Sequence, residues 1–218
     1  MKAMRSRTLI TLLTLGVAAC SDIPVAPTGP GLSPDADVLM SKGSGGDEGG
    51  VRTFVVNPGE RVSERFGNHK LTIPADAVCD PETSGYGADL WDQPCEPIRQ
   101  PIEVTATWST VNGNPAISFS PDLRFVPSDD PSRWVQLSLK HTKGVDEQLY
   151  YSILWRDQKS GQWVDESAQD LTARARPTKS SNKVARRLKH FSDYYLWVGL
   201  GSYNVTSGLG GDALGVVW

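Results

Sequence analysis

Short runs in which apolar and polar residues alternate recur from about residue 51 onward, and they predict a β-rich domain. In the clearest run, 101–109, one face of a strand would carry Ile102, Val104, Ala106 and Trp108. Similar runs rich in Val, Ile, Thr, Tyr and Trp lie at 52–56, 69–74, 116–120, 123–127, 133–141, 149–157, 161–166, 183–191 and 193–200. Their connections are too short for crossover helices, so the pattern predicts an all-β fold, an antiparallel sandwich or partly closed barrel of nine or ten strands.

The first 19 residues have a different pattern, that of a secretory signal. Three basic residues among the first seven precede an apolar run of about 11 residues, whereas a span of the hydrocarbon core needs roughly 20. The tetrapeptide Val17-Ala18-Ala19-Cys20 resembles the lipobox cut by the lipoprotein signal peptidase, with Val17 where most lipoboxes have Leu. This resemblance implies that residues 1–19 are removed and that Cys20 becomes the acylated N-terminus. An ordinary secretory signal with an incidental cysteine is the alternative.

Acylation of Cys20 would determine where the protein resides. Acyl chains such as palmitate contribute about 0.8 kcal/mol per buried methylene, so two or three of them anchor a protein almost permanently. Ser21 follows the cysteine, whereas the best-known lipoprotein sorters read Asp at that place as a signal for the inner membrane. We therefore expect a protein of the cell envelope, attached to the outer membrane rather than to the inner one.

Composition divides the remaining chain into a tether, a domain and a tail. Residues 20–50 are dominated by Pro, Gly, Ser and Asp and bury too little apolar surface to order, so they predict a flexible tether that reaches about 30 Å. Residues 51–202 are expected to form the β-sandwich, followed by a Gly-rich tail at 203–218. The net charge is −3, or about −6 without the three basic residues of the signal, which gives no general reason to expect nucleic-acid binding.

Cys79 and Cys95 are an even pair in a chain that we expect to be exported, and such a pair predicts a disulfide. Closing a loop of this size contributes roughly 3 kcal/mol in the chain-entropy model. A metal site is the alternative, but two thiolates without a nearby histidine are too few for zinc.

The segment GNHKLTIPADA at 67–77, with PIEVTATW and ISFSPDLRFVPS after it, resembles the ZU-five domain of ankyrins, netrin receptors and zonula-occludens proteins. That family has a Gly, a Leu-x-Ile-Pro strand, and later a Phe and prolines around a strand that ends in Pro. In this chain those places hold Leu71, Ile73, Pro74, Phe119, Pro121 and Pro127. The resemblance covers about half of the domain and implies a β-sandwich, but not the animal proteins' partners.

A second resemblance concerns His190-Phe191-Ser192. The ZU-five sandwiches of certain death-domain and inflammasome proteins, and a self-cleaving nucleoporin, cut their own chain at such a triplet. The resemblance implies that the Ser192 hydroxyl attacks the Phe191 carbonyl, that His190 takes its proton as the base, and that water hydrolyses the ester. Alternate residues of a strand point to one side, which would place His190 beside Ser192. The alternative is a hairpin between the last two runs, with Ser192 and Asp193 in the turn, Phe191 in the core and His190 at the surface.

Two further features suggest binding surfaces. Trp91 lies in the segment between the paired cysteines and is expected to be exposed, where its ring could stack on a glycan, whereas most other tryptophans lie in strand patterns and fill the core. Residues 171–190 contain seven Lys or Arg and no acid, a run that could lie against anionic headgroups or lipopolysaccharide. A solvated loop and strand face is the alternative.

The sequence contains no nucleophile elbow, phosphate loop or HExxH motif, and His69 and His141 lie far apart, so neither a metal nor another cofactor is expected. The expected function is that of a binding or structural module of an envelope lipoprotein, and not of an enzyme acting on external substrates. Its expected partners are the membrane, through the lipid on Cys20, and an envelope protein or glycan. Self-cleavage of the Phe191–Ser192 bond is the alternative.

Overall fold

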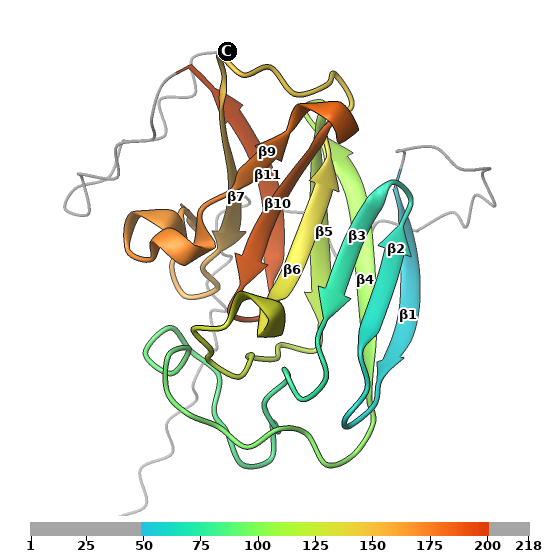
Figure 1. The fold of residues 1–218 in the computed structure, drawn as a ribbon, viewed down its shortest axis with the longest axis vertical. Coiled ribbons are helices and arrows are strands. Elements are labelled where there is room, and N and C mark those ends of the chain that lie inside the picture. Colours follow the sequence, from blue (N-terminus) through green and yellow to red (C-terminus); the bar gives the residue numbers. More distant parts are fainter. Residues whose placement is uncertain (1–48, 201–218) are drawn as a thin grey trace, which may run out of the picture. The chain divides into compact units, whose positions relative to one another are not determined.

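Two antiparallel β-sheets pack face to face in residues 49–200, the part of the chain that this computed structural model describes (Figure 1). The predicted β-sandwich is confirmed. The predicted signal at 1–19, the expected lipidation site Cys20, nearly all of the predicted tether at 20–50 and the predicted tail at 203–218 lie outside the described residues.

The strands are long enough to give each sheet an inner and an outer face. The six-stranded sheet has the order β1 (Gly50–Val56), β4 (Ile102–Val111), β5 (Asn114–Ser120), β11 (Asp193–Gly199), β7 (Tyr150–Arg156) and β8 (Trp163–Val164). The five-stranded sheet has the order β2 (Val62–Phe66), β3 (His69–Ile73), β6 (Val135–Lys140), β10 (Lys183–Leu188) and β9 (Arg176–Thr178). Four short 3-10 helices complete the described elements: η1 (Pro131–Arg133), η2 (Glu166–Ala168), η3 (Leu171–Ala173) and η4 (Lys179–Ser181). Between residues 49 and 200 no helix is long and apolar enough to span a membrane.

The alternation of residues along β4 and β6 explains why these strands lie where they do. In β4, Val104 and Ala106 are completely buried, while Glu103 and Thr107 face outward. In β6, Val135, Leu137 and Leu139 all point into the core, and their side chains are at most 1% exposed. Burial of an aliphatic side chain stabilises the fold by about 1.5–3 kcal/mol, so a register shift of one residue would be strongly disfavoured.

The structure differs from the sequence-based prediction at three strands, one of which is the short β9, which was not predicted. β2 was not predicted, because only the first and last of its five residues, Val62 and Phe66, are apolar. The strand expected at 123–127 is not formed, and this segment makes only isolated bridges to Val78 and His190. Pro127 closes the segment and offers no amide N–H for a regular ladder.

The alternative prediction, a hairpin between the last two strands, is wrong. β10 belongs to the five-stranded sheet and β11 to the six-stranded sheet, so the two strands do not pair. Residues 189–192 cross from one sheet to the other, and His190 is completely buried within this crossing. Because the chain passes through the interior here, the segment between the two strands is core and not a surface turn.

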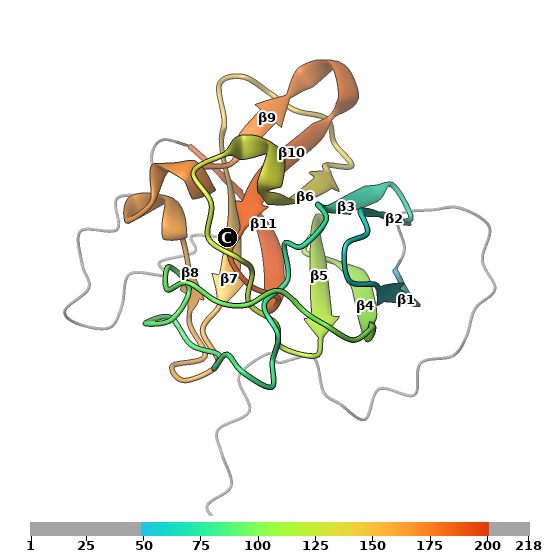
Figure 2. The ribbon, with the colours of Figure 1, turned by 60° about the horizontal axis from the view of Figure 1, so that its bottom comes forward.

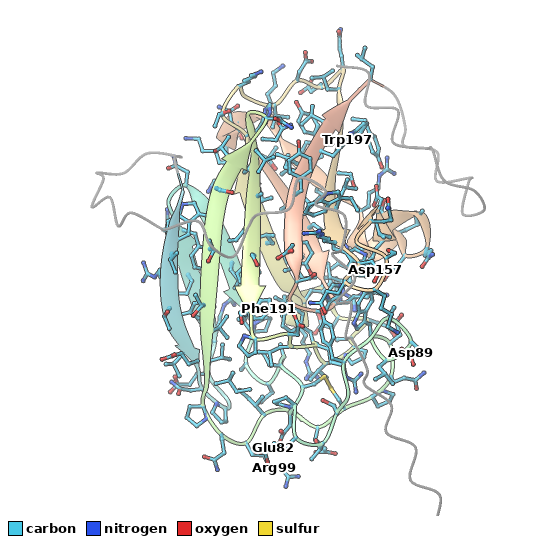
Figure 3. The ribbon with its side chains drawn as sticks, turned by 180° about the vertical axis from the view of Figure 1, so that it is seen from behind. Glu82, Asp89, Arg99, Asp157, Phe191 and Trp197 are labelled. Carbon is cyan, nitrogen blue, oxygen red and sulfur yellow. A yellow bond between two sulfur atoms is a disulfide. The ribbon has the colours of Figure 1, made fainter. Side chains whose placement is uncertain are left out.

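The predicted disulfide between Cys79 and Cys95 is confirmed. We call the residues between these two cysteines, 80–94, the disulfide loop. It contains no strand or helix and lies across one end of the sandwich, as the view of that end in Figure 2 shows. Phe191 lies toward the same end, where Figure 3 also labels Glu82 and Arg99. The disulfide loop and the crossing segment are therefore neighbours in space although they are about 100 residues apart in the chain.

Candidate functional site

The Phe191–Ser192 peptide bond is held from both sides. The Phe191 amide donates to the Leu123 carbonyl at 2.6 Å, and the Phe119 amide donates to the Ser192 carbonyl at 3.2 Å. The Phe191 ring is completely buried, stacked on Phe119 at 4.6 Å and edge-on to Phe125 at 4.9 Å. This anchoring fixes the position of the bond and shields it from bulk water.

Tyr86 of the disulfide loop reaches the carbonyl of this bond. Its hydroxyl donates to the Phe191 carbonyl oxygen at 2.6 Å and also lies 3.1 Å from His190 Nδ1. That nitrogen is itself 3.2 Å from the same carbonyl oxygen. Since the one hydroxyl proton goes to the carbonyl, the hydrogen-bond network assigns a proton to Nδ1. Two donors, one from Tyr86 and one from His190, therefore point at the Phe191 carbonyl oxygen.

His190 occupies an aromatic box. Its ring stacks on Trp91 with centroids 3.7 Å apart and meets Trp155 edge-on at 4.9 Å. Burial, with smaller effects from the nearby cations Arg186 and Lys189, lowers the pKa of His190 to about 3, although the hydrogen bond to the Phe191 backbone opposes this shift. The imidazole is consequently neutral at physiological pH.

The other ring nitrogen of His190, Nε2, is buried and has no hydrogen-bond partner among the described residues. The nearest carboxylate oxygen, Glu166 Oε1, is 3.8 Å away, which is too long for a hydrogen bond. Glu166 instead pairs with Arg186 through its other oxygen, and both side chains are buried. This ion pair satisfies Glu166, so the carboxylate does not draw a proton onto Nε2.

Ser192 lies next to Tyr86 and not next to His190. Its hydroxyl donates to the Arg156 carbonyl at 3.2 Å, and no hydrogen bond joins it to His190 in the described structure. Burial first, and then the charge of Asp122, raise the pKa of Tyr86, while the nearby Ser192 side chain lowers it to a smaller extent. Tyr86 thus stays protonated, with Ser192 on one side and the carbonyl oxygen on the other.

These contacts revise the sequence-based picture of the triplet. The structure brings all three residues together, but it directs His190 at the carbonyl oxygen, as a donor, and not at the serine hydroxyl, as a base. The regular strand that would have paired His190 with Ser192 ends at Leu188. Tyr86, which sequence reasoning missed, fills the gap between them. One sequence feature could have indicated Tyr86: it is an aromatic residue between two glycines, Gly85 and Gly87, inside the loop that the cysteines close.

Trp91 is buried, with 6% of its surface exposed, so the prediction that it is an exposed platform for a glycan is wrong. Its ring covers His190, and Arg124 holds this part of the loop by donating to the carbonyl oxygens of Leu90, Gln93 and Pro94. A guanidinium can satisfy several carbonyls at once, which makes Arg124 an internal brace for the loop.

A cavity of about 240 Å³ lies beside Tyr86, with Cys79, Ser84, Asp122 and Arg124 among its other lining residues. The cavity is lined by both polar and apolar groups and is large enough for several water molecules, because one water needs only about 10–15 Å³ of such volume. Water can therefore stand within reach of the site although the Phe191–Ser192 bond itself is buried.

The basic run at 171–190 is partly used inside the domain. Arg186 pairs with Glu166, Arg187 lies 3.8 Å from Asp170, and the buried Lys189 pairs with Asp170 and with Asp92 of the disulfide loop. Lys179 also lies 3.8 Å from Glu147, so four of the seven cations are engaged in ion pairs, and much of the run serves the fold instead of presenting a free basic surface.

The two other histidines have structural partners. His69 Nδ1 accepts the Lys140 amide at 3.0 Å, and His141 Nε2 lies 3.1 Å from the Asn114 side-chain oxygen. Within residues 49–200 no group of three or more His, Cys, Asp or Glu side chains is arranged to hold a metal ion.

The fold and the buried triplet define an antiparallel β-sandwich with a polarised peptide bond in a crossover between its sheets. Comparison of the chain with family models, with curated proteins and with solved structures finds no match. The function must therefore be inferred from the geometry of the site itself.

Proposed function

We propose that the β-sandwich is a self-processing domain that cuts its own Phe191–Ser192 bond. The observation that carries this proposal is the pair of donors, the Tyr86 hydroxyl and His190 Nδ1, on the carbonyl oxygen of that one peptide bond. Preorganised donors at a carbonyl oxygen stabilise the negative charge that develops there when a nucleophile adds to the carbon. The residue that follows this carbonyl is a serine, whose hydroxyl can act as that nucleophile.

The reaction proceeds as an acyl shift followed by hydrolysis. The Ser192 hydroxyl oxygen forms a bond to the Phe191 carbonyl carbon, the carbon–nitrogen bond breaks, and the hydroxyl proton ends on the released Ser192 nitrogen. The chain is then joined through an ester instead of an amide. Water adds to the ester, giving a carboxylate at Phe191 and restoring the free hydroxyl of Ser192, and the proton released with the carboxylate goes to the Ser192 amino group.

His190 contributes to this reaction as a neutral donor. A positively charged imidazole would be costly in the aromatic box, and burial keeps the pKa of His190 far below physiological pH. The uncharged ring can still donate from Nδ1, and a donor that does not change its charge needs no solvent to reorganise around it.

The domain is proposed to work at the surface of a membrane. The lipobox-like Val17–Cys20, the Pro- and Gly-rich segment after it and the disulfide support an exported lipoprotein, anchored through an acylated Cys20, in the cell envelope. Incorporation of an alkyne-labelled palmitate into the protein in its host, abolished by Cys20→Ala, is the expected result. A protein that keeps residues 1–19 and takes up no label would contradict the anchor.

Self-cleavage is tested by denaturing mass spectrometry of the purified full chain. We expect a fragment that begins at Ser192, absent from Ser192→Ala and present in Ser160→Ala, which changes an exposed turn serine. Hydroxylamine attacks esters, so it should accelerate cutting and leave a hydroxamate at Phe191 in place of the carboxylate. If only intact chain is found with and without hydroxylamine, the proposal fails and the domain is better explained as a binding or structural module.

A further inference from the structure

We propose that Tyr86 is the residue that moves the proton in this self-cleavage, and that the Cys79–Cys95 disulfide holds Tyr86 on the bond, so that cutting begins only after the two cysteines are oxidised. The inference rests on the proposed function and deepens it. It joins two features far apart in the sequence, a disulfide near the middle of the chain and a reactive bond near its end.

Tyr86 is placed to exchange one proton for another. Its hydroxyl donates to the Phe191 carbonyl oxygen at 2.6 Å, and the side chain of Ser192, whose hydroxyl donates to the Arg156 carbonyl, lies beside it. When the Ser192 oxygen adds to the carbonyl carbon, Tyr86 can give its proton to the carbonyl oxygen and accept the serine proton in return. The tetrahedral intermediate is then neutral, and Tyr86 ends the step unchanged.

The second half of the shift balances in the same way. The hydroxyl proton of the intermediate returns to Tyr86 as the carbonyl reforms, and Tyr86 gives its own proton to the Ser192 nitrogen, which leaves with one proton more than it had in the amide. No charged side chain is needed at any point. This suits a site in which Tyr86 cannot readily ionise and His190 cannot readily become charged.

The part of the loop that carries Tyr86 has few other attachments. The braces from Arg124 and Lys189 reach only the later part of the loop, from Leu90 onward. Across 81–89, the hydrogen bonds that leave the loop for the rest of the described domain all come from the Tyr86 hydroxyl. Most side chains of this stretch are exposed and add little packing.

The disulfide covalently joins the two ends of the loop that contains this weakly attached stretch. Cys79 is buried, and its amide N–H donates a hydrogen bond to the Arg124 carbonyl at 3.0 Å, so oxidation ties the later end of the loop to a fixed point of the core. Without the bond the loop gains conformational freedom, and the population with Tyr86 on the Phe191 carbonyl falls. The two thiols lose two electrons and two protons when they join, and an oxidised disulfide donor, reduced to two thiols, takes them up. Cutting is thereby confined to compartments that supply such a donor.

The experiment follows the full chain, made by cell-free translation in dithiothreitol and then transferred to oxidised glutathione. Denaturing mass spectrometry gives the rate at which the fragment from Ser192 appears, before and after oxidation. Four chains are compared: the wild type, Tyr86→Phe, Cys79→Ser/Cys95→Ser, and the variant that combines all three changes. Tyr86→Phe keeps the ring and removes only the hydroxyl, and circular dichroism confirms that each chain is folded.

We expect oxidation to accelerate cutting of the wild type, and Tyr86→Phe to slow the oxidised chain by about 100- to 1,000-fold, the factor typical of removing one donor to a developing oxyanion. Oxidation should not accelerate Tyr86→Phe, because the disulfide acts through the missing hydroxyl. If oxidation accelerates Tyr86→Phe and the wild type by the same factor, the disulfide serves folding alone and the inference is overturned. Equal rates for reduced and oxidised wild type also overturn it, while leaving self-cleavage intact. Absence of the fragment from oxidised wild type refutes self-cleavage itself.

Discussion

Replacement of His190 tests whether its imidazole is held neutral, and the effect is visible in how stability depends on pH. The pKa of this histidine falls from 6.5 to about 3 in the folded domain, mainly through burial. Below pH 6.5 the unfolded chain therefore binds a proton that the folded chain does not. The free energy of unfolding must fall as the pH falls, with a slope that approaches about 1.4 kcal/mol per pH unit and that levels off near the folded pKa.

Between pH 7 and pH 5 this linkage amounts to a loss of about 2 kcal/mol. The carboxylate of Asp170, whose pKa hydrogen bonds from Thr172 and Lys189 lower to about 2 against the opposing effect of burial, loses its stabilising contribution only at more acidic pH. It therefore does not disturb this window. The groups around the ring are the cations Arg186 and Lys189, and Glu166, which is paired with Arg186.

The measurement is urea unfolding followed by tryptophan fluorescence, at pH 7, 6 and 5. His190→Phe is compared with the parent, both in a Ser192→Ala background that keeps the chain intact. His69 and His141 are present in both proteins, so their contributions cancel in the difference. The variant should lose most of the slope whatever its absolute stability. A slope that survives His190→Phe unchanged would refute the reasoning, since the acid sensitivity would then come from other groups.

Three further predictions concern stability, again in Ser192→Ala. Glu166→Gln should cost about 3–5 kcal/mol, because it leaves the buried Arg186 charge without a partner, and combining it with Arg186→Leu should restore most of the loss in urea titrations. Reduction of the Cys79–Cys95 disulfide should lower the free energy of unfolding by about 3 kcal/mol, and Cys79→Ser/Cys95→Ser should be insensitive to reductant; an equal response of that variant would contradict the assignment. Leu137→Ala should cost about 2–5 kcal/mol by calorimetry, whereas a loss below 1 kcal/mol would mean that the core is not packed around it.

Much of the fold could be predicted because its strands alternate clearly. β6 buries every second residue and β4 buries Val104 and Ala106, and this periodicity can be read from the local sequence. β2 escaped prediction because its pairing with β3, and not its own composition, makes it a strand. The hairpin alternative for the last two strands failed for a related reason. The local pattern of apolar and polar residues does not determine to which sheet a strand belongs, and β10 and β11 belong to different sheets.

The candidate site was predictable only in part, for the same physical reason. The His190–Ser192 triplet could be found because its residues are consecutive. The hydroxyl of Tyr86 and the ring of Trp91 come from the disulfide loop and meet His190 across about 100 residues of chain. A tryptophan in a Gly- and Asp-rich loop has the composition of an exposed residue, and only the packing of the loop across the end of the sandwich buries it. Contacts of this kind depend on tertiary structure and leave no local periodicity.

The place of β11 in its sheet determines what would become of the two pieces after scission. This strand lies between β5 and β7 and bonds to both, and its Tyr194 and Leu196 are fully buried. A segment held on both edges and on its inner face would remain in position once its covalent link to β10 is gone. The nicked domain would keep its shape and migrate as one particle until a denaturant or a mechanical pull along the chain extracts the strand. A strand held in this way resists thermal motion but separates under force, so the proposed cleavage would make release of the piece from Ser192 onward depend on tension along the chain.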